Sequence, residues 1–171
     1  LSNYSWNSNL SEYVASIAKK YNPNVISVQG GPNFPHDDEK QIEFLKNRPS
    51  TDIFAIMESE ITLTNIINRI LESKLDRKKI FSKSIDGTVF IQPSTKYKKN
   101  VEFVKGNPSE RIKFLDEIPS PYLSGMLDKF FDGKLTPFIE TNRGCPFKCS
   151  FCHTGADYFQ KIHMFSIDRI K

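Results

Sequence analysis

Three cysteines grouped within eight residues are the part of this sequence best suited to chemistry. They are the only cysteines of the chain, and Cys145, Cys149 and Cys152 have the spacing C-x3-C-x2-C. Three thiolates from one short loop suit a soft metal ion or an iron–sulfur cluster. A four-iron cluster held by three cysteines leaves one iron open to another ligand. The spacing therefore predicts a cluster with a free position for a small molecule.

Structural zinc, with His153 as the fourth ligand, is the main alternative for this metal site. Zinc sites usually gather two ligand pairs that are separated by a dozen or more residues. Here all four candidates lie within nine residues, and the adjacent side chains of Cys152 and His153 cannot easily face one ion. We favour the cluster and keep open a zinc-stabilised binding module, whose Lys-rich segment would contact an acidic partner.

A second candidate site lies where two short apolar segments end. Gly30-Gly31-Pro32 follows the segment 25–28, and Glu58-Ser59-Glu60 follows the segment 52–57. In open α/β sheets, ligands bind outside the carboxyl ends of the strands. Glycines suit such a place because backbone can approach a bulky ligand where no Cβ intervenes.

The elements that position these residues alternate between helix and strand. Periodicity predicts helices over 9–21, 37–46 and 59–71, and β-branched runs predict strands over 25–28 and 52–57. Asn9 is the expected cap of the first helix, with Glu12 three residues later. One face of that helix carries Leu10, Tyr13, Val14, Ile17, Ala18 and Tyr21, and the expected buried stripe of the third helix is Ile61, Ile66, Ile67, Ile70 and Leu71. This alternation indicates a doubly wound α/β domain with a parallel sheet covered by helices on both faces.

After residue 79 the pattern changes. Segments 80–85 and 88–91 around Asp86-Gly87 predict a β-hairpin with a two-residue turn. A Lys-, Pro- and Asn-rich stretch follows, then a short predicted helix over 123–131 and a strand over 136–143 that leads to the cysteines. We therefore divide the chain into an α/β domain (1–90), a connector (91–135) and the start of another domain (136–171).

Composition excludes several classes of protein. The chain of 171 residues has 38% hydrophobic and 26% charged residues, as folded proteins do, and its longest apolar run, Ile53 to Met57, is too short to cross a membrane. Its net charge of +4 comes from residues 72–113, which hold few aromatics, so we do not expect nucleic-acid binding. Clustered thiols without a signal peptide favour a reducing, cytoplasmic location. The chain begins at Leu1 in what looks like the end of a strand, so we expect a fragment of a longer protein.

The cysteine loop resembles the cluster-binding loop of the radical S-adenosylmethionine (SAM) superfamily. The resemblance rests on the three cysteines, on Phe151 before the third, and on Asn142-Arg143-Gly144 before the loop. It implies that Cys145, Cys149 and Cys152 hold a [4Fe–4S] cluster and that SAM chelates the open iron. One electron, from a donor such as flavodoxin or ferredoxin, would then cleave SAM to a 5′-deoxyadenosyl radical. It also implies that Phe151 packs near the adenine, beside or instead of an ordinary core role.

The N-terminal part is similar to the cobalamin-binding branch of that superfamily, because Gly30-Gly31-Pro32 and a Pro-rich connector over 115–121 precede the cysteines. The resemblance implies a Rossmann-like domain in which Ser2, Gly30 and Gly31 line a cleft for the nucleotide tail of cobalamin, with Pro32 and Glu58 on the same rim. A partial, TIM-like β/α barrel would begin at 136. The family often has Gly-Glu-Gly-Glu where this chain has Met57-Glu58-Ser59-Glu60.

These resemblances together predict part of a cobalamin-dependent radical SAM enzyme. The expected reaction is methyl transfer to a small molecule or biosynthetic intermediate, and another radical modification stays open. Only about one strand and one helix of the barrel are present after 136, so we expect the piece alone to be inactive. His36 is expected in an exposed loop, and His163 is expected as a half-buried side chain with a hydrogen-bond partner.

Overall fold

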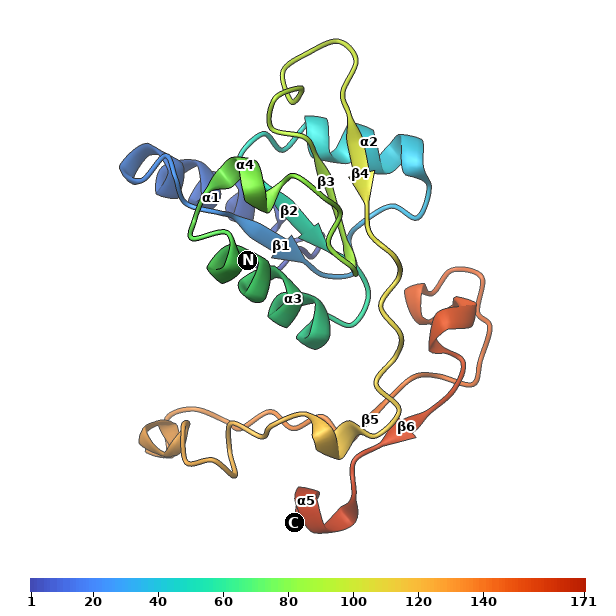
Figure 1. Ribbon diagram of the computed structural model, residues 1–171. Coiled ribbons are helices and arrows are strands. Elements are labelled where there is room, and N and C mark those ends of the chain that lie inside the picture. Colours follow the sequence, from blue (N-terminus) through green and yellow to red (C-terminus); the bar gives the residue numbers. More distant parts are fainter. The chain divides into compact units, whose positions relative to one another are not determined.

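The computed structural model describes residues 1–171, apart from the side chain of His153. The chain divides into two compact units, residues 1–110 and 111–171 (Figure 1). None of the described helices is long and apolar enough to cross a lipid bilayer.

The first unit is built on one mixed sheet. Its strands β1 (Val28–Gly30), β2 (Ile53–Ala55), β3 (Thr88–Ile91) and β4 (Phe103–Lys105) lie side by side in that order. β1 and β2 are parallel, whereas β3 and β4 are antiparallel to their neighbours. The predicted α/β fold is confirmed, but the expectation of a purely parallel sheet is wrong.

Helices cover both faces of this sheet and create two apolar cores. The helices are α1 (Ser8–Tyr21), α2 (Asp38–Lys46), α3 (Glu60–Glu72) and α4 (Arg77–Ile80) (Figure 1). Strand residues alternate between the cores: Ile53 and Phe90 pack with Ile66 of α3, whereas Phe54 and Val89 pack with Leu45 of α2. These cores hold the carboxyl ends of β1 and β2 in place.

The helix predictions are confirmed in position but only partly in orientation. α2 begins as expected, because the Asp37 side chain accepts hydrogen bonds from the amides of Glu39 and Lys40. α1 and α3 form, but neither has a side-chain cap, and the expected apolar stripes are largely in solvent. The exposed members include Leu10, Tyr13, Val14 and Tyr21 in α1 and Ile61, Ile67 and Leu71 in α3. Their buried residues are instead Ser8, Ser11 and Ala15 in α1 and Thr62 and Ile66 in α3.

The predicted hairpin around Asp86-Gly87 is wrong. Asp76 accepts a hydrogen bond from the Lys78 amide and starts α4 at Arg77, so residues 77–80 are helical. Phe81 and Ile85 are then buried in the α3 core without forming a strand. The chain consequently enters the sheet at Thr88, opposite Ala55, and the real hairpin joins β3 to β4 through residues 92–102.

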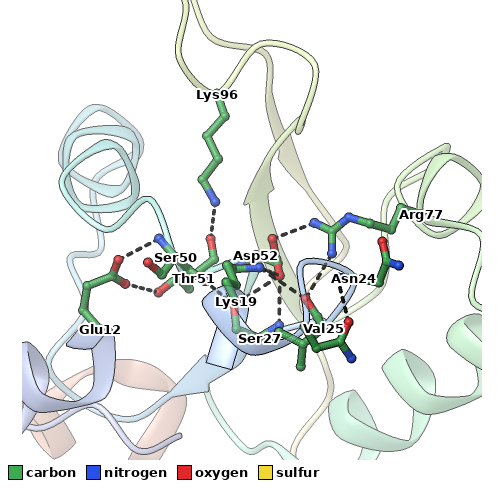
Figure 2. A network of polar contacts seen from close by, with 11 residues as sticks. Glu12, Lys19, Asn24, Val25, Ser27, Ser50, Thr51, Asp52, Arg77 and Lys96 are labelled. Atoms are coloured by element: carbon green, nitrogen blue, oxygen red, sulfur yellow. Dashed lines mark hydrogen bonds and ion pairs between the residues drawn. The ribbon is translucent and has the colours of Figure 1, made fainter. Parts of the chain in front are cut away.

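A buried carboxylate ties together the edge of the sheet where β2 begins. Asp52 accepts hydrogen bonds from the Lys19 ammonium at 2.5 Å, the Ser27 amide at 2.9 Å and the Arg77 guanidinium at 2.9 Å (Figure 2). Burial by itself would raise the pKa of Asp52, but the hydrogen bonds from Lys19, Ser27 and Arg77 together hold it below its ordinary value. The network joins α1, α4 and Ser27, the residue before β1, at the end of the strands opposite the predicted ligand rim.

The second unit has little regular structure. A two-stranded antiparallel sheet pairs β5 (Asn142–Arg143) with β6 (His163–Met164) and is followed by α5 (Ile167–Ile170). The remaining elements are the short 3-10 helices η1 (Leu115–Glu117), η2 (Asp128–Phe130), η3 (His153–Gly155) and η4 (Asp157–Phe159). The predicted helix over 123–131 is therefore reduced to turns and η2, and the predicted strand over 136–143 to its last two residues. The start of a barrel stays a prediction.

Candidate cofactor site

The predicted rim residues of the first unit come together at the end of β1. Ser2 forms a parallel bridge to Gly30, which places residues 1–3 beside β1 as an extra strand. The Gly30 amide donates to the Leu1 carbonyl at 3.1 Å, and the Asn3 amide donates to the Gly30 carbonyl at 2.7 Å. Ser2, Gly30 and Gly31 therefore lie together at the end of β1, and their role in lining a cofactor cleft stays a prediction.

Gly31 is required for the packing of this rim. Its φ of 137° lies outside the range that other residues favour, and a Cβ there would lie 2.5 Å from the Asn3 carbonyl oxygen. The backbone of the amino-terminal segment thus lies directly against the glycine. Pro32 follows on the exposed side.

The acidic turn after β2 adjoins the same rim. A Cβ on Gly30 would lie 3.6 Å from the Ser59 hydroxyl oxygen, so the turn of Glu58 and Ser59 is next to the glycine pair. Glu58 is half-buried. Met57 has a φ of 60°, the left-handed conformation that favours glycine. Met57, at the first position of the family's Gly-Glu-Gly-Glu pattern, thus has a backbone conformation that glycine would adopt more easily.

Three buried carboxamides next to this rim contain polar atoms without a hydrogen-bond partner among the described residues. The atoms are Oδ1 of Asn3, Oε1 and Nε2 of Gln29, and Oε1 of Gln41. Leaving a buried polar atom unpaired costs about 1–3 kcal/mol, so such atoms are expected mainly where water or a ligand completes them. This part of the first unit therefore suits a polar ligand such as cobalamin.

Gln29 and its neighbours were not identified from the sequence. A glutamine in an otherwise apolar strand, immediately before a glycine pair, was the available signal. The stacked rings of Tyr4 and Trp6, with centroids 4.6 Å apart, were also missed. Trp6 is 79% exposed and follows the bridge segment, so it forms an aromatic surface beside the rim.

The cysteine loop follows β5 as predicted. Gly144 turns the chain with a φ of 109°, and a Cβ there would lie 2.3 Å from the Lys161 carbonyl oxygen. The Cys145 amide then donates to the Phe159 carbonyl at 2.8 Å, and the Cys152 amide donates to the Cys149 carbonyl at 3.1 Å. These contacts fold the loop into a short turn.

The three thiols are free, with Cys149 and Cys152 exposed and Cys145 partly buried. A hydrogen bond between Sγ of Cys152 and the Thr154 hydroxyl, at 3.1 Å, lowers the pKa of the Cys152 thiol and so favours the thiolate. Within the described residues, no three His, Cys, Asp or Glu side chains are arranged as a metal-binding group. The donor set of three thiols suits an iron–sulfur cluster in its chemistry, and its role as a metal site stays a prediction.

The remaining predicted residues of the second unit have clear environments. Phe151 is 91% exposed, so the alternative of an ordinary core aromatic is wrong, while its contact with adenine is untested. His163 is buried, and its Nδ1 lies 3.0 Å from the Lys113 carbonyl oxygen, as expected for a histidine with a hydrogen-bond partner. In the first unit, His36 is exposed, as expected. The side chain of His153, the proposed fourth zinc ligand, lies outside the described residues.

The whole chain is similar in sequence to known methyltransferases. The chain is 29% identical over its full length to the cobalamin-dependent radical SAM methyltransferase TokK of Streptomyces tokunonensis. It is 28% identical, again over its full length, to the 2-(S-pantetheinyl)-carbapenam-3-carboxylate methyltransferase of Streptantibioticus cattleyicolor. The two relatives that match the whole chain are thus methyltransferases, one of them a cobalamin-dependent radical SAM methyltransferase.

The similarity extends to an archaeal methyltransferase but covers only part of each relative. The chain is 29% identical over 92% of its length to an uncharacterized methyltransferase of Pyrococcus horikoshii and covers 31% of that protein. The chain spans 24% of the length of TokK and 24% of the length of the carbapenam methyltransferase. The chain matches no protein-family model.

Proposed function

We propose that this chain provides the cobalamin-binding domain and the cluster-binding loop of a cobalamin-dependent radical SAM methyltransferase. One observation carries the proposal. This chain aligns over its full length with such an enzyme, and it contains the C-x3-C-x2-C loop directly after β5. The substrate is proposed to be a small molecule or a biosynthetic intermediate. The protein's own task in such a system is to bind and orient the cofactors, which supply the radical and methyl-transfer chemistry.

Within this proposal, each unit has a distinct role. Ser2, Gly30 and Gly31 would border the cobalamin site of the first unit, next to the buried carboxamides. Cys145, Cys149 and Cys152 would hold a [4Fe–4S] cluster, and the exposed ring of Phe151 would cover the adenine of SAM. A flavodoxin or ferredoxin would donate the electron. Three free thiols that must stay reduced favour a cytoplasmic location.

Anaerobic reconstitution with iron and sulfide tests the metal assignment. We expect the chain to bind about four iron atoms and to show the broad visible absorbance of an iron–sulfur cluster. Cys149→Ala should lose this absorbance and most of the iron, because two thiolates remain. Ser150→Ala, in the same loop, is the matched control and should retain both.

A different metal content would contradict the proposal. Stoichiometric zinc without visible absorbance would instead support the zinc-stabilised binding module. Equal iron content in the parent chain and in Cys149→Ala would show that this cysteine is not a ligand.

A further inference from the structure

A short segment at the start of the second unit, residues 111–116, lies against the chain that returns from the cysteine loop. We call it the brace segment. Nδ1 of His163 lies 3.0 Å from the Lys113 carbonyl oxygen, and the Asp116 carboxylate accepts a hydrogen bond from the Ser166 amide at 3.0 Å. Both contacts join residues that are 50 positions apart in the sequence. The brace segment is therefore held to the returning chain by tertiary contacts.

Arg111, the first residue of the brace segment, contacts the part of the returning chain that lies next to the first cysteine. Its Nη1 donates a hydrogen bond to the Lys161 carbonyl. The same carbonyl oxygen packs against Gly144, because a Cβ at that glycine would lie 2.3 Å from it. Gly144 immediately precedes Cys145. Arg111 thus holds the atom against which the turn into the cysteine loop packs.

The Arg111 guanidinium makes a second contact that leads to the same cysteine. Its Cζ lies 5.6 Å from the centroid of the Tyr158 ring, within the range of a cation–π interaction. The Tyr158 ring meets the Phe159 ring edge-to-face, with centroids 4.9 Å apart. The Phe159 carbonyl in turn accepts the hydrogen bond from the Cys145 amide at 2.8 Å. Arg111 is therefore linked to the backbone of Cys145 through two neighbouring contacts.

The cysteine loop needs such support from outside its own residues. Cys149 and Cys152 are exposed, as are Phe147 and Phe151, so the loop buries few side chains that could fix its shape. Ligands of a metal site must be held within about 0.5 Å of the productive geometry by the residues that support them. An arginine suits this task, because its planar guanidinium can donate to a carbonyl and lie over an aromatic ring.

We propose that Arg111 is a positioning residue for the cysteine loop, which fixes Gly144 and Cys145 where the loop must begin for its three thiolates to hold one cluster. It acts through the returning chain and is not itself a ligand. The inference rests on the proposed function and adds a residue outside the C-x3-C-x2-C motif on which that motif depends.

Amide hydrogen exchange of the full chain, measured without iron, tests the contact directly. In Arg111→Gln the Cys145 amide should exchange about tenfold faster, the change expected for the loss of one hydrogen bond from a charged donor. The Phe165 amide, which donates to the Thr141 carbonyl at 3.1 Å in the same unit, should keep its rate. This second amide separates local positioning from unfolding of the whole unit.

Arg169→Gln is the matched control. Its guanidinium also donates to a backbone carbonyl, that of Asp116 at 2.9 Å, and also lies over a ring, 4.7 Å from the centroid of Phe165. The variant removes the same two kinds of contact away from Gly144, so the Cys145 amide should exchange at the parent rate. Arg111→Lys keeps the charge and a donor but loses the planar group, so it should restore part of the protection.

The iron-loaded protein provides a second measurement. After reconstitution with iron and sulfide, Arg111→Gln should lose its visible absorbance to an iron chelator about tenfold faster than the parent chain, in proportion to the more frequent opening of the loop. Arg169→Gln should lose it at the parent rate, and Arg111→Lys at an intermediate rate.

The outcomes separate this inference from the proposed function. Equal exchange of the Cys145 amide in Arg111→Gln and the parent chain would overturn the positioning role. Faster exchange at both Cys145 and Phe165 would also overturn it, because Arg111 would then support the unit as a whole. Faster exchange at Cys145 with an unchanged rate of cluster loss would overturn the link to the metal site. If the parent chain binds no iron while Arg111→Gln frees the Cys145 amide, the cluster assignment fails and the contact of Arg111 with the loop stands.

Discussion

Asp52 is a single residue on which several segments of the first unit depend. Its side chain is 5% exposed and contacts both Lys19 and Arg77. A buried charge is stable only when it is paired and hydrogen-bonded, and here each carboxylate oxygen has at least one partner. Removing the negative charge would leave two partly buried cations facing a neutral group.

We expect Asp52→Asn to lower the free energy of unfolding at neutral pH by about 3 kcal/mol, as for other broken buried ion pairs. Because the pKa of Asp52 is lowered in the folded state, its contribution is complete above the ordinary carboxyl pKa of about 3.9. The contribution is lost as the pH falls through the folded-state pKa. Urea unfolding of the parent and variant from neutral to acidic pH should therefore show the difference shrinking at the acidic end.

Asp38→Asn is the matched control for this prediction. Asp38 pairs with Lys105 at 2.6 Å, but its side chain is 58% exposed, so its loss should change the free energy of unfolding by less than about 1 kcal/mol. A pH-independent difference between the parent chain and Asp52→Asn would contradict the role given to the Asp52 charge.

At the residue scale, the structure places Ser2 beside Gly30, as the family resemblance groups them, and their role as a cofactor cleft stays a prediction. The carboxamides of Gln29 and Gln41 were not found, because amides occur in many roles and only burial distinguishes these two. The contacts of Asp52 join residues 25 to 33 positions apart, which no local pattern reveals.

At the scale of elements, the turn from β2 to α3 contains a strained residue. Met57 has a φ of 60° and is 38% exposed, so it gains little from packing. Met57→Gly should raise the free energy of unfolding by about 0.5–1 kcal/mol. Glycine removes the cost of the left-handed conformation, about 1–2 kcal/mol, but part of this gain is offset because glycine loses more conformational entropy on folding. Chemical denaturation of both proteins measures the difference.

Ser59→Gly is the control for this turn. Ser59 has an ordinary φ of −105°, so glycine there should only add flexibility and lower the stability. A lower stability for Met57→Gly would mean that the thioether makes contacts that outweigh the backbone strain.

Element prediction succeeded where local signals dominate and failed where tertiary packing does. The helix predicted over 37–46 is confirmed as α2, and its start is held locally by the Asp37 side chain. The prediction that the apolar face of α1 is buried was wrong, because Glu12 on the opposite face accepts hydrogen bonds from the Ser50 amide and the Thr51 hydroxyl. These contacts turn the polar side of α1 toward the segment before β2 and leave Leu10 in solvent.

At the scale of the whole chain, the two units differ in how much core they contain. Most of the buried apolar residues belong to residues 1–110, whereas Leu115 and Phe165 are the buried apolar residues described in 111–171. The second unit leaves many large apolar side chains exposed, among them Leu123, Met126, Phe131 and Phe138. The stability of the chain should therefore come mainly from the first unit.

A shortened chain of residues 1–110 tests this difference. We expect it to unfold cooperatively, with a melting temperature within about 5 °C of the full chain, which corresponds to roughly 1 kcal/mol for a domain of this size. Calorimetry of both chains gives the comparison. Failure of residues 1–110 to fold would show that the second unit contributes to the first unit's stability.

The reversed direction of β3 has a practical consequence. Because β3 starts opposite Ala55 and runs back toward Ile53, the hairpin bend over residues 92–102 lies at the same margin of the sheet as Thr51, whose carbonyl accepts a hydrogen bond from Lys96 at 2.6 Å. Insertions at Lys98 or Lys99 would thus be far from Gly30 along the strands. This bend is where a purification tag or an optical label can be inserted at the end of the sheet opposite Gly30.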